Sequence, residues 1–176
     1  MNIENRLKEA IRDIPDFPIE GIIFKDITPI LLDATLCNDI VDDILDSIKE
    51  PFDAIVGVES RGFLFGLLLA TKANVPFIPA RKKGKLPGDT VACTYDLEYG
   101  SATIEIHKGH IKPNAKVLIH DDLLATGGTA KAAATIVEKV GAQVAAFSFL
   151  VNLDFLKGSD NIKAISQNIY TIATYS

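Results

Sequence analysis

The fold is decided by the stretch Val117-Leu118-Ile119-His120-Asp121-Asp122-Leu123-Leu124-Ala125-Thr126-Gly127-Gly128-Thr129. Its first four residues predict a buried strand, and two adjacent carboxylates follow them. A turn of small residues then leads into a predicted helix with Ala133, Ile136, Val137 and Val140 on its buried stripe. Open α/β sheets bind ligands at the carboxyl ends of their strands. We therefore expect a binding site at this turn.

The turn has the composition of a phosphate cradle. Gly127 and Gly128 allow backbone N–H groups to approach an anion, and Thr126 and Thr129 add hydroxyl donors. The positive end of the following helix dipole favours the same charge. Carboxylates such as the neighbouring Asp pair suit the two hydroxyls of a ribose, or a metal that bridges them. Together these groups describe a site for a ribose 5-phosphate, whereas the simpler interpretation is a surface turn with a capped helix.

Two common nucleotide-binding motifs are absent from the chain. No G-x-G-x-x-G sequence occurs. The segment from Gly57 to Gly62 has the glycine spacing of a P-loop, but Phe63 stands where that motif requires lysine. The sequence therefore favours neither dinucleotide binding nor P-loop chemistry.

Composition narrows the class of protein. The 176 residues include 18 Lys and Arg against 23 Asp and Glu, a formal net charge of −5, with 48% hydrophobic residues. These values predict one compact domain, spanning residues 1–176, with no nucleic-acid or membrane partner. The cysteines, Cys37 and Cys93, match no metal or redox spacing. The N-terminus is charged throughout and has no apolar run, so we expect no secretory signal. We expect a cytoplasmic location.

Short apolar runs alternate with helical patterns along most of the chain. Strands are predicted at 54–58, 75–79, 117–120, 144–151 and 169–173. Amphipathic helices are predicted from Ile3 to Ile14, ending at Pro15, and again over Leu36 to Ile48. An apolar helix is expected from Phe63 to Lys72. This order predicts an α/β fold with a mostly parallel central sheet covered by helices on both faces.

Two segments depart from that alternation. Residues 15–29 hold three prolines and a glycine, so we expect constrained, irregular structure there. Residues 90–106 form two extended runs around Tyr95 to Gly100, which predicts a protruding β-hairpin of the kind that covers an active site.

The residues after the Asp pair resemble the phosphoribosyl-diphosphate motif of type I phosphoribosyltransferases. Further segments are similar to the signatures of the branch of that family that acts on adenine. These are Phe17 to Pro29, Gly57-Val58-Glu59-Ser60-Arg61-Gly62-Phe63, Arg81-Lys82-Lys83-Gly84-Lys85-Leu86-Pro87-Gly88 and Leu97-Glu98-Tyr99-Gly100. The resemblance runs in order from Ile14 to Gly158. It implies the type I fold, with a small N-terminal hood at about 1–34 and a flexible arm at about 81–109.

The reaction implied by this resemblance joins adenine to 5-phospho-α-D-ribose 1-diphosphate (PRPP), giving AMP and diphosphate, as in purine salvage. It further implies a homodimer and Mg²⁺ bound mainly through PRPP, with no direct protein ligand. Charge grows on the departing diphosphate in such a reaction, so cationic donors should gather there. The four cations from Arg81 to Lys85 fit this need.

The resemblance also implies roles for individual residues. The 5-phosphate is expected at Ala125, Thr126, Gly127, Gly128 and Thr129, and the ribose at Asp121 and Asp122. The diphosphate is expected at Glu59, Ser60, Arg61, Arg81 and Lys85, with a cis peptide bond between Glu59 and Ser60. Arg81 is expected to act on the diphosphate of the neighbouring subunit and Lys85 on the local one.

The base and the catalytic groups are implied in the same way. Adenine is expected at Ile22, Ile23, Phe24, Lys25, Asp26 and Arg61, with Phe24 stacking and the Ile23 main chain pairing with the base edge. Glu98 is expected to act as general acid–base toward the purine N7, with Arg61 as a second catalytic residue and Tyr99 closing the lid.

Two positions depart from the family pattern, and two other functions stay open. His120 stands where an aliphatic residue is usual, and Asn152 where an acidic residue is common. One alternative is an enzyme for another 6-substituted purine. The other is a non-catalytic regulator that senses PRPP while binding nucleic acid, although the first 14 residues cannot supply a basic DNA-binding module.

Overall fold

The computed structural model of the protein describes residues 2–97 and 100–176. Within these residues the α-helices are α1 (Ile3–Ala10), α2 (Ala34–Ser47), α3 (Gly62–Ala73), α4 (Gly128–Lys139) and α5 (Gly158–Ile162), with short 3₁₀ turns η1 (Thr28–Leu32) and η2 (Asp154–Leu156). The strands are β1 (Arg12–Pro15), β2 (Ile23–Asp26), β3 (Ala54–Val58), β4 (Phe77–Lys82), β5 (Thr90–Leu97), β6 (Gly100–His107), β7 (Lys116–Leu124), β8 (Gln143–Leu153) and β9 (Ile169–Tyr175).

The main sheet has the order β5-β6-β4-β3-β7-β8-β9. The strands in the order β4-β3-β7-β8-β9 are each parallel to the next. Strand β6 pairs antiparallel with both β4 and β5. The predicted α/β fold with a mostly parallel sheet is therefore confirmed. A separate antiparallel pair, β1 and β2, stands outside this sheet.

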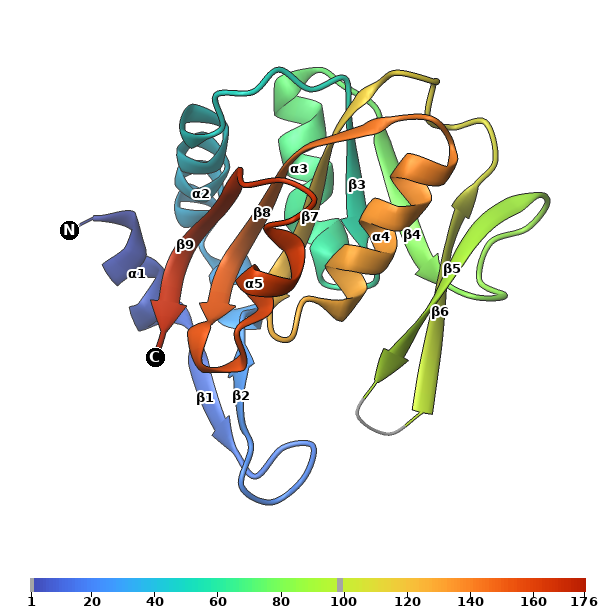
Figure 1. The fold of residues 1–176 in the computed structure, drawn as a ribbon. Helices are drawn as coiled ribbons and strands as arrows, with labels where there is room; N and C mark the ends of the chain where they lie inside the picture. The colour runs from blue at the N-terminus through green and yellow to red at the C-terminus, as the bar shows by residue number, and fades with distance from the viewer. Residues whose placement is uncertain (1, 98–99) are drawn as a thin grey trace.

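Helices cover both faces of the sheet, which explains why strands such as β3 are buried at every position. Helices α1, α2 and α3 enclose one core, with Ile40, Phe65 and Leu118 among its fully buried members. Helix α4, with α5 beside it, encloses the other around residues such as Ile119 and Phe147 (Figure 1). None of the described helices is long and apolar enough to cross a membrane.

The N-terminal segment differs from its prediction. Helix α1 ends at Ala10 instead of Ile14, and Ile14 lies on β1 opposite Phe24 of β2. The backbone pairing with β2 and a 2.6 Å ion pair between Arg12 and Asp26 hold this segment extended. Residues 12–14, expected to be helical, therefore form a strand, because tertiary pairing outweighs the helical period of the apolar residues. The segment 15–29, expected to be irregular, likewise contains strand β2.

Strands β4 and β7 extend further than their apolar runs. Arg81 and Lys82, expected in a loop, are the last residues of β4 and pair with β6. Asp121 and Asp122, expected to follow a strand, lie within β7 because β8 pairs alongside them as far as Asn152. Both strands thus end in polar residues at the same, carboxyl-terminal end of the sheet.

The predicted hairpin is confirmed, since β5 and β6 pair along their whole length. Figure 1 shows this hairpin and the β1–β2 pair both projecting at the end of the molecule where the parallel strands finish. The two projections flank the strand ends that carry the polar residues.

Candidate active site

Asp121 and Asp122 form the centre of the site. Asp122 is buried, with 4% of its surface exposed, and its Oδ2 lies 2.9 Å from Nε of Arg61. This contact is an ion pair without an aligned hydrogen bond, because Oδ2 accepts none within the described residues. The backbone N–H of Asp122 donates to Oδ1 of Asp121 at 2.8 Å. Arg61 and Asp122, 61 positions apart in the chain, are thus brought into contact by the pairing of β3 with β7.

Burial and mutual repulsion set the charge of this pair. Burial, and then the carboxylate of Asp122, raise the pKa of Asp121 well above its ordinary value of 3.8. Burial also raises the pKa of Asp122, although the Arg61 guanidinium opposes this shift. Two ribose hydroxyls would donate to these oxygens, so a bound diol stabilises the ionised pair.

The predicted phosphate cradle lies between β7 and α4. Gly127 precedes the helix with a φ of 81°, a left-handed conformation that other residues rarely adopt. The first N–H groups of a helix have no partner within it, so those of α4 are available to an anion. The hydroxyl of Thr129 donates to the hydroxyl of Tyr95 on β5 at 3.1 Å. This geometry suits a phosphate at the helix N-terminus.

Helix α5 packs behind the cradle. A side chain at Gly158 would collide with the backbone oxygen of Ala125, and a Cβ at Gly127 would lie 2.6 Å from the oxygen of Gly158. The side chain of Asn161 donates to the backbone oxygen of Thr126 at 2.7 Å. Gly158 and Asn161 therefore fix the path of the cradle backbone, although the sequence pattern singled out neither.

The predicted diphosphate residues gather at the ends of β3 and β4. The peptide bond between Glu59 and Ser60 is cis, as the resemblance implies. Glu59 accepts from the backbone N–H of Lys82 at 2.8 Å and from Nε of Arg81 at 3.2 Å. Burial raises the pKa of Glu59, but these donors lower it by more, so it stays below its ordinary value of 4.5. Arg81 also donates to the backbone oxygen of Lys85 at 3.2 Å.

Arg61 connects the strand ends to the predicted base region. Its guanidinium carbon lies 4.7 Å from the centre of the Phe24 ring, and Nη1 donates to the backbone oxygen of Lys25 at 3.4 Å. The side chains of Ile22 and Ile23 are exposed, so apolar surface faces solvent beside Phe24. One cation therefore touches both the carboxylate pair and an aromatic face suited to a purine.

The side chains of Lys25 and Asp26 already have partners within the protein. The ammonium of Lys25 pairs with Asp13 at 2.7 Å and lies 4.0 Å from the centre of the Tyr175 ring. Asp26 accepts from Arg12 and from the backbone and hydroxyl groups of Thr28. Their contribution to a base would therefore come from the main chain. Glu98 and Tyr99 lie outside the described residues.

The two departures from the family pattern are both buried, His120 on β7 and Asn152 further along the adjacent strand β8. His120 is fully buried, and its Nδ1 lies 2.8 Å from the hydroxyl of Ser148, whereas its Nε2 has no partner among the described residues. Burial lowers the pKa of this imidazole to about 3. Asn152 donates weakly to Asp154 at 3.4 Å. Neither side chain contacts the Asp pair in the described interactions.

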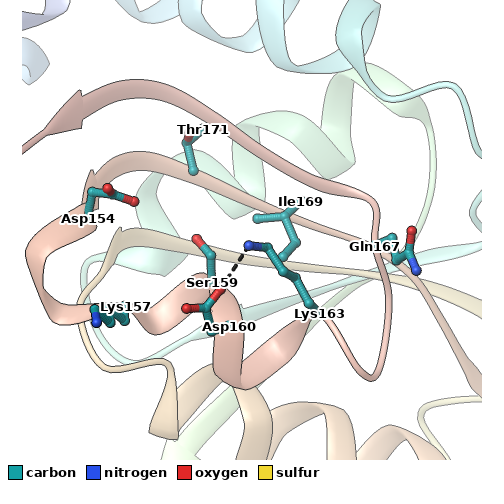
Figure 2. Close-up of a pocket in the computed structure, with 8 residues that line it drawn as sticks. All are labelled: Asp154, Lys157, Ser159, Asp160, Lys163, Gln167, Ile169 and Thr171. Carbon is teal, nitrogen blue, oxygen red and sulfur yellow. Dashed lines mark hydrogen bonds and ion pairs between the residues drawn. The ribbon is translucent and has the colours of Figure 1, made fainter.

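A separate hollow of about 470 Å³ lies along the edge strand β9, as Figure 2 shows. Its charged residues are two lysines and two aspartates, and Lys163 pairs with Asp160 at 2.9 Å. These charges balance, and the lining includes none of the residues expected to bind PRPP. The hollow therefore lacks the excess positive charge that a diphosphate requires.

The sequence matches the family of phosphoribosyl transferase domains over residues 25–170. The fold and the strand-end site thus define the class of protein, a phosphoribosyltransferase. Among curated relatives, an adenine phosphoribosyltransferase of Cytophaga hutchinsonii is 49% identical, with 98% of this chain and 96% of the relative covered. One of Sorangium cellulosum is 54% identical, with 86% of this chain and 76% of the relative covered.

Solved structures agree with this placement. The adenine phosphoribosyltransferase of Thermoanaerobacter pseudethanolicus is 43% identical and superimposes with a TM-score of 0.94, covering 99% of this chain and all of that one. The enzyme of Saccharomyces cerevisiae, solved with adenine and an imino-altritol bisphosphate, has 40% identity and a TM-score of 0.90 over 97% of this chain and 98% of that one. The chain belongs to the adenine phosphoribosyltransferases, a branch of the phosphoribosyltransferase family.

Proposed function

We propose that the protein transfers the 5-phosphoribosyl group of PRPP to N9 of adenine, giving AMP and diphosphate in purine salvage. One observation carries this proposal: Arg61 contacts both Asp122 and the Phe24 ring, so a ribose site and a purine site adjoin. Ligand classes seen with relatives support it. The yeast enzyme was solved with adenine, and that of Trypanosoma brucei with AMP, pyrophosphate and ribose-5-phosphate.

In this proposal each part of PRPP meets its own group of residues. The 5-phosphate binds the cradle residues Ala125, Thr126, Gly127, Gly128 and Thr129, and the ribose hydroxyls bind Asp121 and Asp122. The diphosphate binds Glu59, Ser60, Arg61, Arg81 and Lys85. The backbone amides and cations suit phosphate oxygens, and the carboxylates suit hydroxyl donors. This arrangement exposes the ribose carbon that bears the leaving group to the base.

The reaction breaks the bond between the ribose carbon and the diphosphate and forms the bond from that carbon to N9. The electron pair of the broken bond leaves with the diphosphate, and the base loses its N9 proton. Positive charge near the leaving group stabilises this step: Lys85 supplies it from the same subunit, and Arg81 supplies it from the neighbouring one. We assign Glu98 as general acid–base toward N7 and Tyr99 as the residue that closes the lid, so that water is excluded.

Mg²⁺ enters this proposal as the counter-ion of PRPP, and therefore with the substrate. Among residues 2–97 and 100–176, no group of three or more His, Cys, Asp or Glu side chains comes together. We propose that the ion is held mainly by diphosphate and ribose oxygens, beside Asp121 and Asp122. When bound, the ion neutralises charge on the leaving diphosphate.

We further propose a homodimer, a cytoplasmic location, and the division into a hood at about 1–34 and an arm at about 81–109. Helix α3 supports the dimer, because Leu64, Leu67 and Leu68 are exposed opposite its buried residues. A helix that is apolar all round is normally covered on both sides. The free thiols of Cys37 and Cys93 suit a reducing compartment.

A base-specificity assay tests the proposed function. Purified protein is given PRPP and Mg²⁺ with adenine, hypoxanthine, guanine or xanthine in separate reactions, and nucleotide formation is measured for each. We expect AMP to form far faster than IMP, GMP or XMP, with no nucleotide formed when PRPP is omitted. Formation of IMP without AMP would assign the protein to another 6-substituted purine.

A further inference from the structure

Glu105 is a buried carboxylate that the proposed reaction leaves without a role. It lies on β6 between Ile104 and Ile106, and only 5% of its surface is exposed. A charged side chain rarely occupies such a position without partners, because burial without hydrogen bonds costs several kcal/mol. Its surroundings therefore indicate what it does.

Within the described residues, the side chain of Glu105 accepts hydrogen bonds from the segment that follows β4. Oε1 accepts the backbone N–H of Gly84 at 2.9 Å, and Oε2 accepts the hydroxyl of Thr90 at 3.1 Å. The backbone N–H of Leu86 also helps to lower the pKa of this carboxylate. The basic loop, which we define as residues 82–89, is thus wrapped around one carboxylate from the neighbouring strand.

These donors keep Glu105 ionised. Burial raises its pKa, but the bonds from Gly84, Thr90 and Leu86 and the charge of Lys83 lower it by more, so the pKa lies below the ordinary value of 4.5. A negative charge at the centre of the basic loop also reduces the repulsion among the loop's own cations. The lysines of this loop, Lys82, Lys83 and Lys85, are all exposed.

We propose that Glu105 is a positioning residue that holds the basic loop in the shape that binds the diphosphate of PRPP. The amide of Gly84 is bonded to Glu105, so it is not free for the ligand. The loop therefore offers the diphosphate its cationic side chains, whereas the cradle before α4 offers the 5-phosphate its backbone amides. This inference rests on the proposed function, which places the diphosphate at this loop.

The variant Glu105→Gln tests this proposal, because it keeps the shape of the side chain and one acceptor oxygen but removes the charge. Three quantities are measured: the KM for PRPP, the inhibition constant for inorganic diphosphate, and the dissociation constant for AMP, which carries no diphosphate. We expect the first two to rise about tenfold, as the loss of charge-assisted hydrogen bonds implies, and the third to stay within about twofold of wild type.

Asp89→Asn is the matched control, because it removes an exposed carboxylate from the same loop. It should leave all three constants unchanged. Glu105→Ala, which removes both acceptor oxygens, should weaken diphosphate binding more than Glu105→Gln. If that variant fails to fold, the glutamine variant still decides the question.

Two results would overturn the proposal. One is a diphosphate inhibition constant that Glu105→Gln leaves unchanged. The other is an affinity for AMP that falls by the same factor as that for diphosphate, which would show a general structural role. Failure of the proposed function would look different, because the wild-type protein itself would then show neither turnover of PRPP nor inhibition by diphosphate.

Discussion

The Nε atom of Arg61 lies 2.9 Å from Oδ2 of Asp122, and the same guanidinium stacks over the ring of Phe24. Arg61 belongs to the turn between β3 and α3, Asp122 to β7 and Phe24 to β2. One side chain thus connects three segments that are far apart in the sequence. In the proposed function it fixes the base region relative to the ribose site, so its geometry should matter as much as its charge.

Replacing Arg61 with lysine tests that statement. Lysine keeps the positive charge but lacks the planar group that can stack on Phe24 while pairing with Asp122. We expect kcat/KM for adenine to fall by at least about tenfold in steady-state assays. Arg6→Lys is the control, because Arg6 also pairs with an aspartate, Asp39 at 2.7 Å, on helices away from the site. Wild-type kcat/KM in Arg61→Lys would contradict the role.

The raised pKa of Asp121 predicts a cost in stability. Because burial and Asp122 raise this pKa above 3.8, the folded state binds more protons than the unfolded state above about pH 4. Stability therefore falls as pH rises from there toward the folded-state pKa. Asp121→Asn should raise the thermal midpoint of the ligand-free protein at pH 7 by about 2–4 °C, the shift that ~1 kcal/mol gives in a chain of this size.

Thermal melts from pH 4 to pH 8 check this prediction, and the gain should shrink toward pH 4. Asp160→Asn is a useful control, because Lys163 lowers the pKa of this exposed carboxyl, so its removal should bring no gain. If Asp121→Asn were less stable than wild type at pH 7, the ionised Asp121 would not cost stability, and the prediction would be wrong.

The buried pair of His120 and Ser148 predicts sensitivity to acid. Burial lowers the pKa of His120 to about 3, so between pH 6.5 and pH 3 the unfolded state binds the extra proton and stability falls as pH falls. Between pH 7.5 and pH 5 the loss is about 2 kcal/mol. The double variant His120→Val with Ser148→Ala removes both polar partners, so it should lose less stability between these two pH values. Urea unfolding at the two pH values measures this difference, and equal losses would refute it.

Gly158 should be essential for the cradle, because a Cβ there would collide with the backbone oxygen of Ala125. Such overpacking typically costs 1–3 kcal/mol. We expect Gly158→Ala to weaken AMP binding about tenfold or more, as measured by calorimetry. The neighbouring change Ser159→Ala should have no such effect. Unchanged AMP affinity in Gly158→Ala would mean that the cradle tolerates a displaced backbone.

The parallel core of the fold could be predicted from the sequence because most of the buried positions of its strands are apolar. The helical spacing of Ile3, Leu7 and Ile11 likewise predicted α1. The residue at which this helix ends could not be predicted from the neighbouring residues in the sequence. Ile14 continues the helical spacing, and only the pairing of Arg12 to Pro15 with β2 makes it a strand. The same holds for Arg81 and Asp121. Strands β4 and β7 extend to these residues because each pairs there with a neighbouring strand, which the local sequence does not show.

The site was predictable where its residues are adjacent in the chain. The composition of the Asp pair and of the small residues from Ala125 to Thr129 indicates a phosphate site at the end of a strand. Tyr95, Asn161 and Glu105 could not be found this way, because each acts on a segment at least 15 residues away. For Glu105 one signal exists: a single carboxylate between two isoleucines of a strand indicates a buried charge with partners.

The affinity for PRPP tests the central claim, that Asp121 and Asp122 bind the ribose beside the cradle, most directly. Isothermal titration of wild type and of the double variant Asp121→Asn with Asp122→Asn, both with Mg²⁺ and without adenine, gives this affinity. Because two charge-assisted hydrogen bonds are lost, we expect binding at least about 100-fold weaker in a variant that melts no lower than wild type. An affinity within about twofold of wild type would contradict the account.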